Sequence, residues 1–153
     1  MISNACVEHI DAIKKICDIQ LGQGYIPRHR IVTAHISIVA IDECEVIGWA
    51  AADIINEKLA QLSHCVVKPE YEGRGIATRL VQERLMRLAF RGIPNCVSYC
   101  WKHPDGKIPM AGILTKFEFF PVKTIKKAFA KTNCKCCGHD CACDCVVFFK
   151  KGI

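Results

Sequence analysis

Residues 62–91 read LSHCVVKPEYEGRGIATRLVQERLMRLAFR, and this stretch predicts a strand, a glycine-rich loop and a helix. The strand is the apolar, β-branched run at residues 62–67, which Pro69 ends because proline lacks a backbone donor. Apolar residues then recur at helical spacing from Ile76 to Leu88. The charged and polar residues of this helix are expected mostly on its opposite, exposed face. They are Arg79, Gln82, Glu83, Arg84, Arg87 and Arg91.

The loop Gly73-Arg74-Gly75 opens this helix and is a candidate anion site. The first amides of a helix have no partner within the helix and lie at the positive end of its dipole. Glycine lets a phosphate approach these amides, and Arg74 adds positive charge beside them. An ordinary tight turn has the same short pattern, so the glycines alone leave both interpretations open. The spacing matches neither a dinucleotide-binding fold nor a P-loop.

The same stretch resembles the acetyl-coenzyme A motif of the GNAT superfamily of N-acetyltransferases. In that motif a strand ending in Val-x-Pro precedes Arg/Gln-x-x-Gly-x-Gly/Ala, and this chain has Val67-Lys68-Pro69 followed by residues 72–77. Glu72 stands where the family usually has Arg or Gln. A carboxylate there would repel a pyrophosphate unless it points away or pairs with Arg74. The resemblance implies that backbone groups of the strand bind the pantetheine arm of acetyl-coenzyme A and that the loop binds its pyrophosphate. The residues concerned are Cys65, Val66, Val67, Gly73, Arg74, Gly75, Ile76, Ala77 and Thr78.

Length and composition predict one domain over residues 1–153, with 51% hydrophobic and 24% charged residues. No apolar run approaches the roughly 20 residues that span a bilayer. The N-terminus lacks the order of a signal peptide, so we expect a cytoplasmic protein without a membrane partner. The net charge is +6, and lysines gather late in the chain. They are Lys123, Lys126, Lys127, Lys131 and Lys135. Without interleaved aromatic residues this run indicates a solvated face rather than a nucleic-acid site.

The remaining patterns complete an α/β order of elements. Ser3 or Asn4 is expected to cap a helix that ends at Gly22 and Gly24, and the next segment, through residue 35, has no regular period. Tyr25, Arg28, His29 and Arg30 in that segment are candidates for the acceptor side, and a plain surface loop explains them equally well. Strands are predicted at residues 36–41, 46–54, 62–67, 96–101, 117–122 and 145–149, and a second helix after Pro109. By resemblance this is the GNAT fold, a mixed, mostly antiparallel sheet flanked by helices, with a cofactor cleft between the third and fourth of these strands.

Six of the twelve cysteines fall between Cys134 and Cys145. Cys134, Cys137, Cys141 and Cys143 include a Cys-x-x-Cys-Gly turn, and four soft ligands at this spacing match tetrahedral Zn²⁺ in a structural site. A related tail in some GNAT proteins favours these four over Cys136, His139 and Cys145. A metal-free, cysteine-rich loop and an iron–sulfur cluster are the alternatives. We name residues 133–145 the cysteine knuckle.

The resemblance implies an N-acetyltransferase that uses acetyl-coenzyme A and acts on a primary amine of a small molecule or a protein. Glu57 and His64 are candidate bases, although His64 also fits a core histidine. In the family a tyrosine frequently serves as the general acid, and Leu114 occupies its position in this chain. Tyr99, Cys100 or solvent is therefore left as the proton donor. The alternative function is a non-catalytic acyl-coenzyme A-binding or interaction module with a structural zinc knuckle. Both functions are compatible with an oligomer.

Overall fold

The structure, a computed structural model, describes residues 1–130, 134–138 and 140–153. The elements in this part of the chain are β1 (Ile2–Asn4), η1 (Val7–His9), α1 (Ile10–Gln20), α2 (Arg28–Thr33), β2 (Ile36–Asp42), β3 (Glu45–Asn56), β4 (Leu59–Val67), η2 (Pro69–Tyr71), α3 (Ile76–Phe90), β5 (Asn95–Lys102), α4 (Ala111–Lys116), β6 (Phe120–Ile125) and β7 (Asp144–Lys151). The described strands form a seven-stranded sheet in the order β1-β2-β3-β4-β5-β7-β6. Strands β4 and β5 are parallel, and the other neighbouring pairs are antiparallel. This mixed sheet confirms the predicted fold class.

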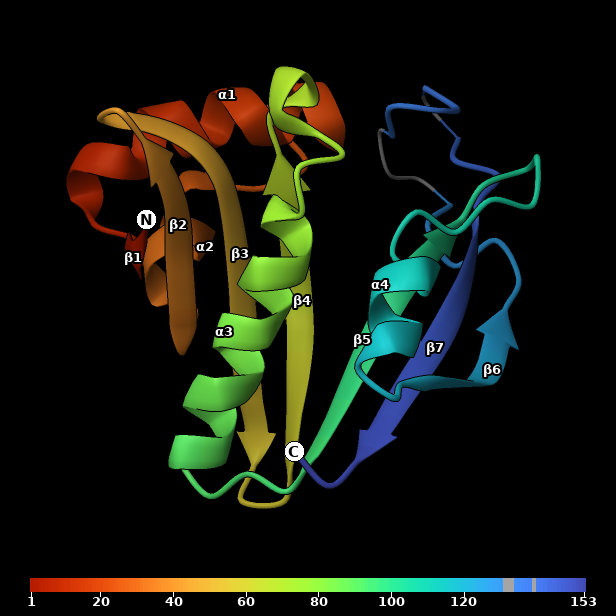
Figure 1. Cartoon of the computed structure of the whole chain (residues 1–153). Coiled ribbons are helices and arrows are strands. Elements are labelled where there is room, and N and C mark those ends of the chain that lie inside the picture. The colour runs from red at the N-terminus through yellow and green to blue at the C-terminus, as the bar shows by residue number, and fades with distance from the viewer. Residues whose placement is uncertain (131–133, 139) are drawn as a thin grey trace.

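Helices cover both faces of the sheet. In Figure 1, α3 and α4 lie in front of it, and α1 and α2 lie behind it. Strand β3 contributes to a core on each face because its side chains alternate: Trp49 and Ala51 pack with α1, whereas Ala50 and Ala52 pack with α3. The sheet is therefore buried on both sides along its central strands.

The strands β4 and β5 separate along their length. They pair only from Leu59 with Asn95 to Leu62 with Ser98, and Figure 1 shows them diverging toward the end where α3 begins. The register of β4 against β3 shifts at the same level, so that Ser63 is an extra residue, a β-bulge. Helix α3, between β4 and β5, makes the parallel connection that the sequence predicts.

The N-terminal third of the chain differs from the prediction in two places. Ser3 and Asn4 do not cap a helix; they belong to β1, which pairs with the edge of β2, and Cys6 precedes the first helical turn. The segment expected to be irregular contains the short helix α2, which follows Pro27. Proline is harmless before a helix because the first helical amides need no partner within the helix.

The predicted strand at residues 117–122 begins later than expected. Phe117 ends α4, and Glu118 adopts φ 62°, so the extended backbone starts at Phe120. Lys131, the first residue of the cysteine knuckle (Asn133) and His139 lie outside the described residues. Within the described chain, no helix combines the length and the apolar character needed to cross a membrane.

Candidate active site

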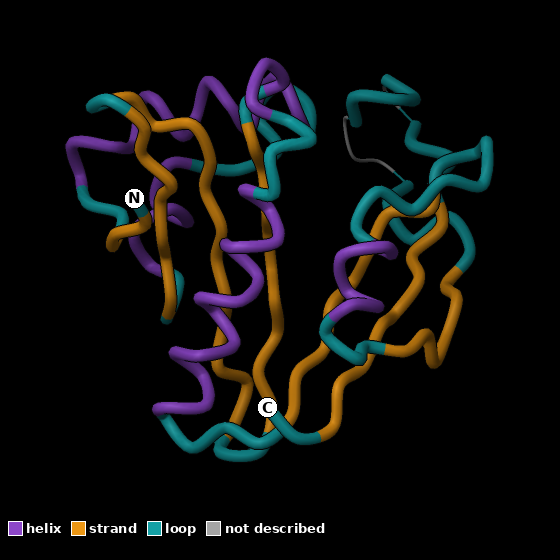
Figure 2. The backbone as a smooth tube through the Cα atoms, viewed as in Figure 1, coloured by secondary structure: helices purple, strands orange, loops and turns teal. Residues whose placement is uncertain are grey.

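A cleft of about 810 Å³ occupies the space between β4 and β5. Its sides come from β4, β5, the start of α3, α4 and the end of α1. Figure 2 shows the loops before α3 and after β5 at the same end of the molecule, where the two strands have diverged. The cleft therefore lies where the sequence predicts a cofactor site.

The glycine turn lies at this cleft. Gly73 and Gly75 line it and have φ angles of 74° and 76°, which glycine adopts without strain. Gly75 immediately precedes α3, and a Cβ atom at either glycine would meet open space. The unpartnered first amides of α3 are thus accessible to an anion from the cleft side.

Glu72 also lines the cleft, but its carboxylate does not pair with Arg74 as the sequence suggested. Gln20, at the end of α1, donates a hydrogen bond from Nε2 to Glu72 and another, 2.6 Å long, to the carbonyl oxygen of Val67. Arg74 lies over the ring of Tyr71 instead, with 4.9 Å between its guanidinium carbon and the ring centroid. Without Gln20, the Glu72 carboxylate would lie beside the phosphate site with no hydrogen-bond donor from α1. Gln20 supplies that donor.

The predicted residues of β4 and β5 line the same cleft. Cys65, Val66 and Val67 approach from β4, and Tyr99 and Cys100 approach from β5. Tyr99 is 46% exposed, whereas Cys100 is 5% exposed. Burial raises the pKa of Cys100 to about 11, so its thiol is protonated at neutral pH.

His64 lines two cavities. It borders the cleft and also a second cavity of about 460 Å³, which is lined mainly by the loop between α1 and α2, including Tyr25, and by Arg30 of α2. Its ring stacks on Trp49 with centroids 5.7 Å apart. Burial, followed by the positive charge of Arg30, lowers the pKa of His64 to about 4. At neutral pH the imidazole is therefore uncharged and has one nitrogen that can accept a proton.

A hydrogen-bonded group beside His64 involves Asp53, whose carboxylate accepts from Arg30 and from Ser63. Burial raises the pKa of Asp53, but these two hydrogen bonds and the Arg30 charge outweigh it, and the pKa lies below the usual range. Arg28 pairs instead with Asp11, and neither it nor His29 lines the two cavities. Of the four acceptor-side candidates, the structure thus brings Tyr25 and Arg30 to the site.

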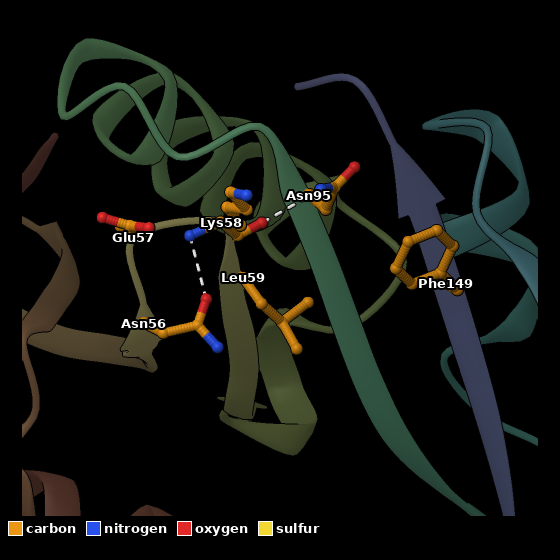
Figure 3. Close-up of a pocket in the computed structure, with 6 residues that line it drawn as sticks. All are labelled: Asn56, Glu57, Lys58, Leu59, Asn95 and Phe149. Atoms are coloured by element: carbon orange, nitrogen blue, oxygen red, sulfur yellow. Dashed lines mark hydrogen bonds between the residues drawn. The ribbon is translucent and has the colours of Figure 1, made fainter.

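Glu57 lies elsewhere. It is exposed in the turn between β3 and β4, at the opposite end of β4 from the glycine turn, beside a hollow that Asn95 and Phe149 also line (Figure 3). Two hydrogen bonds hold the backbone of this turn. Lys58 N donates to Asn56 Oδ1, and Asn95 Nδ2 donates to the Lys58 carbonyl. Glu57 does not line the cleft and is therefore not part of the proposed site.

The four predicted ligand sulfurs come together in the cysteine knuckle. All sulfur atoms of Cys134, Cys137, Cys141 and Cys143 lie within 4.8 Å of one another, and three of the four residues are buried. The amide of Cys137 donates to the sulfur of Cys134 at 3.2 Å, and that of Cys143 to the sulfur of Cys141 at 3.4 Å. Tetrahedral Zn²⁺ with bonds of about 2.3 Å requires sulfurs about 3.8 Å apart, so this group fits the ion.

The neighbouring cysteines do not join this group. Cys136 is exposed, and Cys145 packs with Val97 and Val147 of the sheet. All twelve cysteines lie in the described part of the chain and are free thiols. His103, at the end of β5, contacts the sulfur of Cys143 at 3.4 Å through Nδ1, and so connects the group to the cleft that it also lines.

Comparison with known proteins identifies the family. The model of the acetyltransferase (GNAT) family matches residues 12–119. The chain belongs to the GNAT acetyltransferase family. A comparison with curated protein sequences finds no match.

Solved structures of GNAT acetyltransferases share the whole fold. Ard1 from Thermoplasma volcanium has a TM-score of 0.83 at 11% identity, over 100% of this chain and 97% of that one. An aminoglycoside 6'-N-acetyltransferase complexed with coenzyme A has a TM-score of 0.81 at 16% identity, over 100% and 97%. Ribosomal-protein-alanine N-acetyltransferase from Brucella melitensis has a TM-score of 0.77 at 15% identity, over 99% of both chains. These likenesses concern the fold.

Several residues at this GNAT site were not predicted from the sequence. Gln20 binds Glu72 52 residues away, Asp53 binds Arg30 23 residues away, and His103 contacts Cys143 40 residues away, so no local pattern marks them. Arg84 was expected on the exposed face of α3, yet it is 1% exposed. Its position four residues after Leu80 and four before Leu88 was the available signal.

Proposed function

We propose that this chain transfers the acetyl group of acetyl-coenzyme A to a primary amine of a small molecule or a protein. The observation that carries the proposal is the meeting of two cavities at His64. The first has the glycine turn at its edge and suits the cofactor. The second opens beside the α1–α2 loop and suits the acceptor.

Backbone groups would bind the cofactor in the first cavity. The amides of residues 73–78 would bind the pyrophosphate, which the positive end of the α3 dipole favours there. The carbonyl of Val67, which accepts a hydrogen bond from Gln20, marks the edge of β4 that β5 leaves open. Pantetheine amides would pair along this edge, at Cys65 and Val67.

The reaction requires a free amine and a polarised thioester. The amine nitrogen attacks the carbonyl carbon, the carbon–sulfur bond breaks, and coenzyme A leaves as the thiolate. We assign the acceptance of the amine proton to neutral His64, directly or through water. Tyr99 and the protonated thiol of Cys100 are the donors available to the thiolate on β5.

We further propose that the four thiolates of the cysteine knuckle bind a structural Zn²⁺. Their number, burial and mutual distances match a closed tetrahedral site, and their amide-to-sulfur hydrogen bonds are the kind that stabilise thiolates. A site with four protein ligands has no open position for substrate. The ion would therefore hold the connection before β7 and take no part in acetyl transfer.

One observation favours a second candidate, a non-catalytic acyl-coenzyme A-binding module. Leu114, at the position of the family's acidic tyrosine, is fully buried and lines the cleft, and it cannot donate a proton. Coenzyme A thiolate leaves without an acid in principle, so the two candidates differ in turnover and not in cofactor binding. Both share the glycine turn and the cysteine knuckle.

Calorimetric titration with acetyl-coenzyme A, followed by a thiol-release assay over an amine panel, separates the candidates. The panel includes aminoglycosides and peptides with a free N-terminus, which correspond to the named substrates of structural neighbours. Binding with turnover supports the transferase. Binding without turnover on every amine supports the module, and no binding contradicts both.

The glycine turn provides the matched test. Gly75→Val places a branched side chain at a φ of 76° beside the proposed pyrophosphate, and we expect acetyl-coenzyme A binding to fall below detection. Gly152→Val introduces the same side chain at a φ of 75° outside the residues that line the cleft, and it controls for backbone strain. Equal affinity in the two variants would contradict the proposed phosphate site.

A further inference from the structure

Arg84 is a positively charged residue in the interior of this domain. It is 1% exposed, and no carboxylate among the described residues forms an ion pair with it. Guanidinium groups stay protonated in proteins, and burying a charge without an opposite charge costs several kcal/mol. An apolar residue would pack here at lower cost. The location therefore indicates a role other than stability.

The guanidinium binds the backbone at the bulge of β4. Its Nη1 donates to the carbonyl oxygens of Ala51 at 2.9 Å and His64 at 3.0 Å, and its Nε donates to that of Leu80 at 3.1 Å. Ala51 and His64 are register partners, and the extra residue Ser63 immediately precedes His64 on β4. A bulge disrupts the hydrogen bonds between strands, and Arg84 supplies donors at that place.

This contact determines where the next amide points. In a trans peptide group the C=O and the N–H lie on opposite sides, so the bond to the His64 carbonyl directs the N–H of Cys65 away from Arg84. Cys65 and Val67 are two residues apart and share an edge of β4. The Val67 carbonyl on that edge accepts from Gln20, and β5 pairs with β4 no further than Leu62. The Cys65 N–H thus points into the cleft.

The second terminal nitrogen of Arg84 is unused. Nη2 is buried and has no hydrogen-bond partner among the described residues, and Arg84 lines the cleft together with Ser98 and Cys100 of β5. When an amine attacks a thioester, negative charge develops on the carbonyl oxygen and then on the leaving sulfur. A fixed positive charge in a site that excludes water favours both species.

We propose that Arg84 is a positioning residue that holds the His64–Cys65 peptide so that the Cys65 N–H donates to the thioester carbonyl oxygen. The inference rests on the proposed function, because it assumes that the acetyl group of acetyl-coenzyme A lies in the cleft. The same guanidinium lines the cleft, where its positive charge would favour the leaving thiolate. This charge compensates for the proton donor that Leu114 cannot provide.

Infrared difference spectroscopy of bound, isotope-labelled acetyl-coenzyme A tests the proposal. A hydrogen bond to the thioester oxygen lowers the carbonyl stretching frequency, so the wild type is expected to show a band below that of free acetyl-coenzyme A. In Arg84→Met the band returns toward the free value. Arg84→Lys keeps the charge and one donor and is expected to restore part of the shift.

Arg87→Met is the matched control, because Arg87 lies on the same helix and pairs with Glu83 at the surface. It is expected to leave the band unchanged. With an amine that turns over, Arg84→Met lowers kcat roughly 100-fold while the KM for acetyl-coenzyme A changes little, since the phosphate contacts remain.

Three results would overturn the proposal. A folded Arg84→Met protein with the wild-type band shows that the peptide needs no such support. If Arg84→Met does not fold, a wild-type band at the frequency of free acetyl-coenzyme A shows that no amide donates to the thioester oxygen, and the proposal is wrong on that ground. Absence of acetyl-coenzyme A binding by the wild type removes the proposed function itself, and calorimetry detects that outcome separately.

Discussion

His64 illustrates how distant neighbours set the chemistry of one side chain. Its sequence context, an apolar strand, is equally typical of a core histidine and of a base at a site. Trp49 stacks on the ring, Arg30 lies on the acceptor side, and burial keeps the imidazole neutral. A neutral ring between the two cavities can accept a proton from an amine, which the charged form cannot do.

The pH dependence of stability follows from the lowered pKa of His64. The folded protein binds this proton near pH 4, whereas the unfolded chain binds it near 6.5, so the unfolded state holds more protons in between. The free energy of unfolding should therefore fall as the pH drops from 6.5 to 4, with a contribution of roughly 2–3 kcal/mol from His64. Urea denaturation across this range measures it.

The variant His64→Gln is expected to remove this part of the pH dependence. His29→Gln serves as the control, because His29 is exposed and lines neither cavity. A His64→Gln protein that loses as much stability in acid as the wild type would contradict the lowered pKa.

At the scale of an element, the cysteine knuckle depends on its four thiols as well as on apolar packing. The connection between β6 and β7 brings few apolar side chains to the sheet, but Trp101 and Phe129 pack against the buried cysteines. Four thiols in this small space repel one another when ionised, and a divalent cation offsets that repulsion. A bound metal would hold the chain that leads into β7.

Metal analysis of the purified protein is expected to find one zinc per chain. Cys143→Ser should lose the zinc and lower the unfolding temperature by roughly 5–10 °C, because metal binding contributes directly to folding. Cys136→Ser alters an exposed neighbour outside the four and should keep both the zinc and the unfolding temperature. Zinc retained in Cys143→Ser would contradict the ligand set.

Across the whole molecule, hydrogen bonds join the two halves of the divided sheet over the cleft. The knuckle residue Lys135 donates from its amide to the Leu21 carbonyl at 3.1 Å and from Nζ to Gln20 Oε1 at 2.9 Å. Gln20 in turn binds Glu72 and the Val67 carbonyl. The knuckle thus reaches α1 and, through Gln20, the end of β4 beside the glycine turn.

This connection predicts an effect on cofactor release. Lys135→Ala removes the side-chain link across the cleft, and acetyl-coenzyme A should dissociate roughly two- to tenfold faster, the value of one such hydrogen bond. Stopped-flow displacement measures the rate. Lys126→Ala breaks the ion pair between Lys126 and Asp144, which lies away from the cleft, and provides the control. Equal dissociation rates in both variants would show that the link does not retain the cofactor.

Much of the fold could be predicted because its signals are local. The alternation of β3, the helical period of α3 and the glycines before it depend on residues that are neighbours in the chain. The bounds of β2, β3 and β5 agree with the predicted strands to within a few residues. β1 was missed because a three-residue edge strand has no period of its own and forms only when β2 is present to pair with it.

The sequence by itself determined the order of elements from β2 to β7, the glycine turn before α3 and the spacing of the four cysteines. Each is a pattern within one segment, where backbone geometry and side-chain period act over a few residues. Only the tertiary structure decided that Arg84 is buried beneath the β4 bulge, that Gln20 binds Glu72, and that Glu57 lies far from the cleft. Those outcomes depend on groups brought together from distant parts of the chain. The interactions between these groups contribute free energy only once the sheet has formed.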